Sequence, residues 1–139
     1  MKKNESNNLS SIIDKLDPKK YNEIEISTKS FRPWGSYEIL KESNNFKVKE
    51  LTINPKASIS LQKHIKRSEH WVVVEGEDIA TKGKRKIKLK KNRSIDIKAG
   101  EVHRLQNNSN KQCRIIEVQT GDYLGEDDII RYEDTYNRN

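Results

Sequence analysis

The sequence contains a single cysteine, Cys113, among 139 residues, so no disulfide within the chain can stabilise the fold. Cys113 lies in a strand-like run and is expected to be a small buried hydrophobic residue. The lack of paired cysteines favours a reducing compartment, which we expect to be the cytoplasm. No apolar run reaches the roughly 18 residues of a membrane-spanning helix, and the first residues lack the apolar stretch of a signal peptide. We therefore expect no membrane partner.

Apolar residues are also scarce, at 32% of the chain against 35% charged residues. This length and composition predict one folded domain with a polar segment beside it. We place the polar, partly disordered segment and linker at residues 1–30 and the folded domain at residues 31–139. The N-terminal segment holds one short helical stripe, formed by Leu9, Ile12, Ile13 and Leu16.

Positive charge is concentrated in one segment. The net charge is +7, yet residues 82–93 alone hold eight basic side chains and no acidic one, so the rest of the chain is slightly acidic. Ile87 and Leu89 alternate there with lysines, which predicts a strand with one solvated face. Because no aromatic residues interleave with these charges, we expect no nucleic-acid partner and rank nucleic-acid binding as the weakest function considered.

Short runs rich in valine, isoleucine and aromatics follow Phe31 and are separated by turn sequences such as "ESNN", "NPKA" and "KAGE". Such spacing predicts an all-β sandwich or barrel. The predicted strands are 36–40, 46–53, 58–64, 69–75, 84–90, 93–97 and 112–119. In 46–53 the apolar phase slips between Val48 and Leu51, which predicts a β-bulge. Carboxylates near Glu126 suit the start of a short C-terminal helix.

One stretch, "LQKHIKRSEHW", brings Gln62, His64 and Glu69 close together in the sequence. Gln62 and His64 share one strand face, and Glu69 can return on a neighbouring strand. His103 follows 39 positions after His64, and a closed barrel can bring it back. This nitrogen and oxygen set suits zinc, manganese, cobalt or iron. The alternative is that these are hydrogen-bonded polar residues that hold no metal. His70 should face away and be structural or interfacial.

These residues resemble the two cupin motifs. Gln62, His64, Glu69 and Gly76 match the first motif, and Gly100, His103 and Asn107 match the second. The chain departs from the family at turns, with Lys56 and Asn92 in place of glycines and Lys98 in place of a proline. The resemblance implies a double-stranded β-helix, or jelly-roll barrel, with the short helical segments above at its N- and C-terminal ends.

Four blocks narrow the resemblance to the type II mannose-6-phosphate isomerase domain. They are "FRPWGSYEIL", "SLQKHIKRSEHWVVVEG", "AGEVHRLQN" and "IIEVQTGDYLGEDDIIRYEDTY", spread over about residues 31–138. In that family the domain usually closes a two-domain enzyme whose first domain is a mannose-1-phosphate guanylyltransferase. This sequence has no Gly-rich nucleotide loop, so we expect a stand-alone isomerase domain.

The resemblance implies interconversion of mannose 6-phosphate and fructose 6-phosphate through a cis-enediol, in support of GDP-mannose and polysaccharide synthesis. It implies a divalent ion at Gln62, His64, Glu69 and His103, with zinc expected first. It also implies a homodimer. The alternative function is a non-catalytic cupin module that binds a sugar phosphate or sugar nucleotide.

The sequence offers candidates for the remaining roles. Glu117 and Gln119 share one strand face, and Glu117 is the candidate general base, although a solvent-facing role is the alternative. Arg67 and Arg104 lie beside presumed ligands and are candidates for binding the phosphate, with Arg104 also counted among the catalytic residues. Both arginines could instead pair with structural carboxylates. Trp34 is expected to pack rather than to bind sugar.

Overall fold

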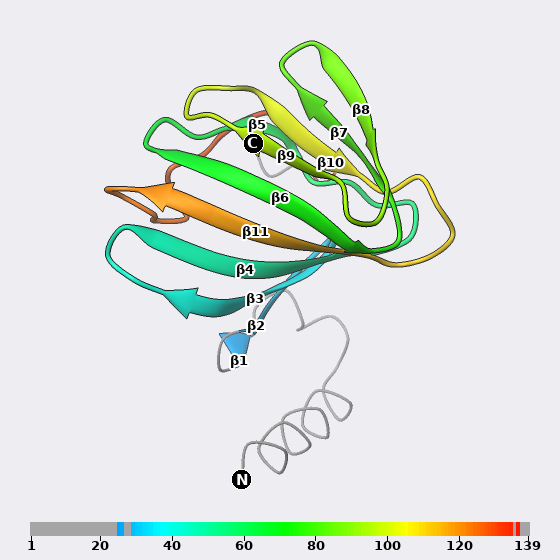
Figure 1. Cartoon of the computed structure of the whole chain (residues 1–139), viewed down its shortest axis with the longest axis horizontal. Helices are drawn as coiled ribbons and strands as arrows, with labels where there is room; N and C mark the ends of the chain where they lie inside the picture. The colour runs from blue at the N-terminus through cyan, green and yellow to red at the C-terminus, as the bar shows by residue number, and fades with distance from the viewer. Residues whose placement is uncertain (1–24, 27–28, 135, 137–139) are drawn as a thin grey trace, which may run out of the picture.

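The computed structural model describes residues 25–26, 29–134 and 136, and the predicted N-terminal helix lies outside them. The described residues form strands and turns (Figure 1). The strands are β1 (Glu25–Ile26), β2 (Lys29–Arg32), β3 (Gly35–Glu42), β4 (Phe46–Ile53), β5 (Leu61–Lys63), β6 (Arg67–Glu75), β7 (Asp78–Lys82), β8 (Arg85–Leu89), β9 (Ser94–Ile97), β10 (His103–Gln106), β11 (Cys113–Gly121) and β12 (Ile130–Glu133).

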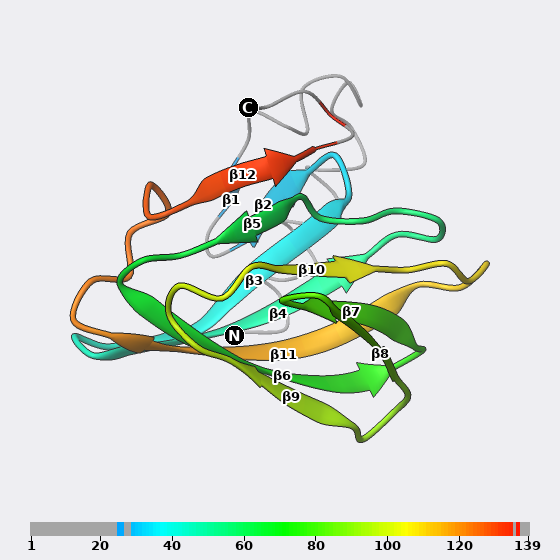
Figure 2. The ribbon, with the colours of Figure 1, turned by 90° about the horizontal axis from the view of Figure 1, so that it is seen from above.

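The strands form two antiparallel sheets, and the predicted all-β barrel is confirmed. One sheet has the order β1-β2-β3-β4-β11-β6-β9, and the other has the order β12-β5-β10-β7-β8. Figure 2 shows the two sheets from above, with β10 and β5 lying across from β11 and β4. The core between them is built from buried apolar side chains of both sheets, including Leu51, Ile53, Trp71, Val73, Leu105 and Ile115.

The strand β4 differs from its predicted form. Its buried positions are Lys47, Lys49, Leu51 and Ile53, so one face points inward along the whole strand. The β-bulge predicted in β4 is therefore wrong, and the apolar pattern shifts because the inward positions of the first half of the strand hold lysines rather than apolar residues. The register shift nearby lies in the partner strand β3, between Ile39 and Lys41.

The C-terminal helix predicted near Glu126 is also wrong. A turn and the strand β12 follow instead, and β12 pairs with β5. The Asp128 carboxylate accepts hydrogen bonds from the backbone amides of Ile65 and Lys66, each at 2.9 Å, and so serves a neighbouring turn instead of a helix start. Within the described residues no helix is long and apolar enough to cross a membrane.

Other strands lie outside the predicted runs. β7 and β10 escaped prediction because they are short and carry charged or polar residues between their apolar ones. β1 and the first half of β2 precede residue 31, where the strand pattern was expected to begin. The basic segment forms most of the β7–β8 hairpin, with β8 at the edge of its sheet and Ile87 facing inward between exposed lysines. The predicted solvated strand is thus confirmed.

Two turns keep a conformation that usually requires glycine. Lys56 has φ 61° and Asn92 has φ 75°, and these are the positions where the cupin motifs have glycine. The backbone of the motif is therefore retained, although its glycines are not. A lysine with positive φ is strained by roughly 1–2 kcal/mol, whereas asparagine tolerates this region far better.

Lys56→Gly should therefore stabilise the protein by up to about 1 kcal/mol, since relief of strain exceeds the entropic cost of glycine. The lost hydrogen bond from Lys56 Nζ to Asn108 O is solvent-exposed and offsets little. Asn92→Gly is the matched control and should change stability much less. Urea unfolding of the two variants checks this, and a less stable Lys56→Gly protein would contradict it.

The buried pair of Asp78 and Cys113 lies at the opposite end of the core from the histidines. Asp78 is 2% exposed and Cys113 is fully buried, as expected for the cysteine. One Asp78 oxygen accepts from the Gln106 amide at 2.6 Å. Burial raises the pKa of Asp78 to about 7, and burial together with Asp78 raises the pKa of Cys113 to about 12.

A raised folded-state pKa of Asp78 means that the folded protein binds a proton more tightly than the unfolded chain. The stability linked to Asp78 is therefore fully present below about pH 4 and is lost as the pH rises toward 7. Asp78→Asn keeps the acceptor for Gln106 and should remove this part of the pH dependence. Unfolding free energies of both proteins from about pH 4 to 8 check it; a difference between them that stays constant with pH would refute it.

Candidate metal centre and its cavity

The inner face of the larger sheet becomes polar toward one end. The register places Trp71 of β6 and Lys49 of β4 on either side of Glu117 of β11. The successive inward rows across β4, β11 and β6 are Lys49–Glu117–Trp71 and Lys47–Gln119–Glu69. These side chains are all buried, so strand alternation alone carries two carboxylates and two lysines into the barrel.

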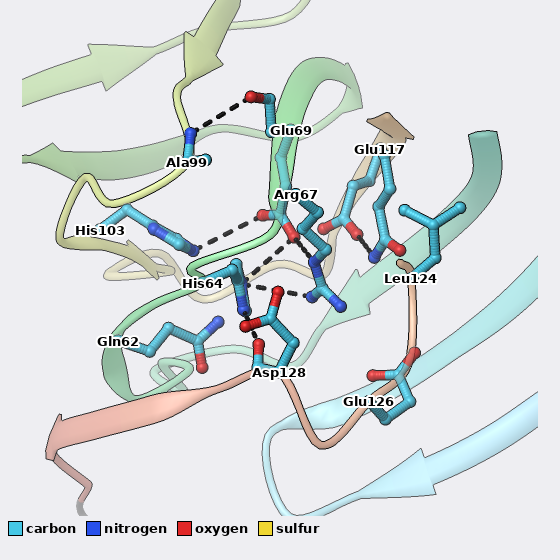
Figure 3. A network of polar contacts seen from close by, with 12 residues as sticks. Gln62, His64, Arg67, Glu69, Ala99, His103, Glu117, Leu124, Glu126 and Asp128 are labelled. Atoms are coloured by element: carbon cyan, nitrogen blue, oxygen red, sulfur yellow. Dashed lines mark hydrogen bonds and ion pairs between the residues drawn. The ribbon is translucent and has the colours of Figure 1, made fainter. Parts of the chain in front are cut away.

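The second sheet supplies the facing ligands. His103 at the start of β10 pairs with Gln62 of β5, so both side chains leave their sheet on the same side. His64 follows directly after β5, and Glu69 lies on β6. Figure 3 shows these four side chains converging from three strands and the β5–β6 turn.

His64, Glu69 and His103 come close enough to share one ion. One ligand atom from each lies within 4.8 Å of the others. His64 Nε2 is 3.3 Å from one oxygen of Glu69, and His103 Nε2 is 3.5 Å from the other oxygen. Both histidines and the glutamate are at least 96% buried.

Hydrogen bonds on the far side of each ring orient the two histidines. His64 Nδ1 donates to the Asp128 carbonyl at 2.6 Å, and His103 Nδ1 donates to the Glu101 carbonyl at 2.9 Å. This assignment leaves the lone pair of each Nε2 directed toward Glu69. Carbonyl acceptors behind imidazoles are the usual outer partners of metal-bound histidine. Among the described residues, His103 Nε2 has no hydrogen-bond partner, which also fits a ligand atom.

Electrostatics keep these groups in the states that bind metal. Burial alone would raise the pKa of Glu69, but the proximity of His64 and the charge of Arg67 hold that pKa far below its usual range. Burial lowers the pKa of His103, which favours the neutral imidazole. An ionised carboxylate and neutral imidazoles are the forms that coordinate a divalent ion. The residues therefore fit a metal centre.

Gln62 and Arg67 complete the centre. Gln62 extends toward His64 in Figure 3, and its Oε1 accepts a hydrogen bond from Ser60 at 2.7 Å. Arg67 is buried, with Nε donating to Glu69 at 2.9 Å and Nη2 lying 3.2 Å from His64 Nε2. Its Nη1 has no hydrogen-bond partner in the part of the chain that the structure describes. Arg67 is thus part of the centre itself, rather than of the cavity mouth.

Glu117 lies beside this group on β11. Its Oε2 accepts from the indole Nε1 of Trp71 at 3.3 Å, and its Oε1 accepts from the amide of Gln119. Burial raises the pKa of Glu117, and the negative charge of Glu69 adds to this, although Lys49 and Arg67 act in the opposite direction. A carboxylate with a raised pKa is a competent proton acceptor near neutral pH.

One cavity connects these elements. Gln62, Arg67, Glu69 and Glu117 line its inner part. Its other walls are formed by Arg32, Trp34, Tyr37, Lys49, Leu51, Ile59, Glu126, Ile129 and Arg131. The cavity thus joins two of the candidate metal ligands, Gln62 and Glu69, to a candidate base and several cations, as a site for a small anionic molecule requires.

Some predicted site residues lie elsewhere. Arg104 follows His103 on β10 and therefore points to the opposite face, where Nε donates to the Ile59 carbonyl at 3.1 Å and Nη2 to the Glu133 carbonyl at 3.0 Å. The structure does not place it on the cavity, so its predicted phosphate and catalytic roles lose their support. His70 is exposed, as expected. Trp34 packs in the core but also forms part of the cavity wall.

Sequence reasoning missed Lys49, Glu126 and Arg131. Lys49 was hidden because an inward lysine was read as a break in the apolar pattern. Glu126 was assigned to a helix, and Arg131 lies on β12, which was not predicted. The sequence did contain a signal for Lys49. It lies two residues before Leu51 and four before Ile53, a spacing that puts all three side chains on the same strand face.

A barrel of two antiparallel sheets with two histidines and a glutamate gathered inside it defines the chain as a cupin. A double-stranded β-helix protein from Klebsiella pneumoniae subsp. pneumoniae has the same fold, with a TM-score of 0.62 at 18% identity, over 85% of this chain and 96% of that one. The chain belongs to the family described as Mannose-6-phosphate isomerase C-terminal, whose model matches residues 19–134.

Two curated relatives support this assignment. Xanthan biosynthesis protein XanB from Xanthomonas campestris pv. campestris is 47% identical over 79% of this chain and 24% of its own length. Alginate biosynthesis protein AlgA from Pseudomonas putida is 43% identical over 91% of this chain and 26% of its own length. The chain spans about a quarter of the length of these relatives.

Proposed function

We propose that this domain is a metal-dependent isomerase that interconverts mannose 6-phosphate and fructose 6-phosphate. The observation that carries the proposal is the opening of one cavity onto both Glu69 of the metal centre and Glu117. The family assignment and the relatives named for xanthan and alginate synthesis support a role in making sugar precursors for polysaccharides, which we take to include GDP-mannose.

Gln62, His64, Glu69 and His103 would hold the ion, and we propose zinc first, with manganese, cobalt or iron as alternatives. A divalent ion there supplies Lewis acid chemistry at the sugar's carbonyl and hydroxyl oxygens. The ligand set suits this task because two neutral imidazoles and one carboxylate leave a net positive centre.

Glu117 would carry the proton between C2 and C1 of the sugar on one face of the cis-enediol. Trp71 and Gln119 each donate to one of its oxygens and so fix the direction of the carboxylate. Because the site is buried, the proton that Glu117 takes from one carbon is held for return to the other. Arg67 lies next to Glu69 and would stabilise negative charge on the substrate oxygens.

The charge of the cavity suits a sugar phosphate. Arg32, Lys49, Arg67 and Arg131 line it against Glu69, Glu117 and Glu126, so the side chains carry one net positive charge before any ion binds. A divalent ion raises this to three, which complements the two negative charges of a phosphate monoester.

A second candidate is a cupin module that binds the sugar phosphate without turnover. The observation that favours it is the coverage, since this chain spans about a quarter of the relatives' length. The activity of those longer proteins need not reside in the matching quarter alone. A coupled assay for fructose 6-phosphate, run on the purified chain with mannose 6-phosphate and added divalent metal, separates the two. Turnover supports the isomerase, and sugar-phosphate binding without turnover supports the module.

A further inference from the structure

Two lysines, Lys47 and Lys49, are buried at successive inward positions of β4, and Lys49 lines the cavity. The side chains of Lys47 and Lys49 are 7% and 4% exposed, and both come from the inward face of β4. Isolated buried ammonium groups are costly, so each needs an anionic partner. A pair of them concentrates positive charge in a small volume that is shielded from water.

Their shared anionic partner is Glu126, on the connection between β11 and β12 formed by residues 122–129. Lys49 Nζ donates to a Glu126 oxygen, and Lys47 Nζ lies 3.9 Å from the same oxygen. Lys47 also donates to the Leu124 carbonyl at 3.1 Å and lies 3.6 Å from Glu42. The Lys49 ammonium is 4.1 Å from the centre of the Tyr37 ring.

Glu126 differs from the lysines in its exposure. Its side chain is 50% exposed, so the carboxylate reaches into the lysine site from solvent. The β11–β12 connection is also held by contacts that do not involve Glu126, because Asp128 binds the amides of Ile65 and Lys66, the Asp128 carbonyl accepts from His64, and the Leu124 carbonyl accepts from Lys47. Glu126 can therefore leave the lysines by rotating its own side chain, without release of the connection.

We infer that Lys47 and Lys49 bind the phosphoryl group of the substrate and that the Glu126 carboxylate occupies this site until the phosphate displaces it. This inference rests on the proposed function, since it names how the same cavity recognises a phosphorylated sugar. A phosphate dianion offers three oxygens and twice the charge of a carboxylate, so it can engage both ammonium groups at once. An unphosphorylated hexose has no group that could replace Glu126.

The displacement has a measurable consequence. Phosphate binds only to the fraction of molecules whose lysine site is vacated, so its apparent affinity is reduced by that fraction. Glu126→Gln keeps a hydrogen-bond acceptor for Lys49 but removes the competing charge. It should therefore tighten binding of inorganic phosphate by about tenfold, within the usual range of such couplings.

The experiment is isothermal titration of inorganic phosphate into the metal-loaded protein and into three variants. Asp127→Asn is the matched control, because it removes the same charge from the neighbouring residue of the same connection, where Asp127 is exposed and contacts Tyr123. It should leave the affinity nearly unchanged.

Lys49→Met should weaken phosphate binding at least tenfold. Circular dichroism checks that the variant is folded. If Lys49→Met does not fold, Lys47→Met replaces it in the same measurement.

The inference would be overturned if inorganic phosphate bound with the same affinity to the wild type, Glu126→Gln and Asp127→Asn. It would also be overturned if Glu126→Gln and Asp127→Asn increased the affinity for phosphate equally. Retention of wild-type affinity in a folded lysine variant would overturn it too. These readouts need no turnover. A protein that binds phosphate as described but does not isomerise sugar would reject the proposed function and leave the lysine site standing, although as the phosphate site of a binding module.

Discussion

Replacement of His103 by alanine is expected to abolish isomerisation of mannose 6-phosphate. The side chain is fully buried, with Nδ1 held by the Glu101 carbonyl and Nε2 directed at Glu69, so the substitution removes one of the candidate ligands from a preorganised group. The amount of metal bound per chain should fall sharply when the metal concentration in solution is micromolar. Turnover should drop at least about 10²–10³-fold, the usual cost of removing a preorganised electrostatic group from an active site.

His70→Ala is the matched control, because His70 follows Glu69 on the same strand but is exposed. It should keep both metal and turnover. Since a truncation in the core costs roughly 2–5 kcal/mol, His103→Gln provides a second variant that fills more of the space. Circular dichroism establishes that each variant is folded. A folded His103 variant with full metal content and full turnover would show that His103 is not a ligand.

Replacement of Glu117 by glutamine is expected to remove turnover without removing metal. A general base contributes about 10²–10⁴-fold, so kcat should fall by that factor. The structure can accommodate the amide, because the Oε1 of Gln119 has no hydrogen-bond partner within the described residues and a rotated Gln119 can accept from the new amide group. Trp71 can still donate to the remaining oxygen of residue 117.

The readouts are kcat, KM for mannose 6-phosphate and metal content. Glu50→Gln, on the outer face of the same sheet, is the control and should behave like the wild type. A Glu117→Gln protein with normal kcat would exclude Glu117 as the base. One that has lost its metal would instead indicate that Glu117 acts by supporting the ligands.

The fold and the convergence of the candidate ligands could be predicted from the sequence where a simple period governs the side chains. Alternation placed Glu117 and Gln119 on one face of β11, which the structure shows to be the inward face, and the motif spacing brought His103 back to His64 and Glu69. The turns at Lys56 and Asn92 kept their positive φ without glycine, because the strands on either side fix them.

The rest of the cavity could not be predicted, since its residues break the rules that the prediction used. Lys47 and Lys49 face inward, against the expectation that lysines are exposed, and they do so because Glu126 neutralises them from a distant segment. Arg104 was placed near the phosphate by its nearness to His103 in sequence. Adjacent residues in a strand have side chains on opposite faces, so Arg104 points away from the cavity because His103 points toward it.

The dependence of turnover on metal is tested most directly by titrating the metal-stripped chain with divalent ion. The conversion of mannose 6-phosphate to fructose 6-phosphate is measured after each addition. We predict no turnover in strong chelator and a rise in proportion to added metal, ending at one ion per chain, as expected for a single centre at His64, Glu69 and His103. Full turnover by the metal-free chain would contradict this account, as would binding of the sugar phosphate without turnover at any level of zinc, manganese, cobalt or iron.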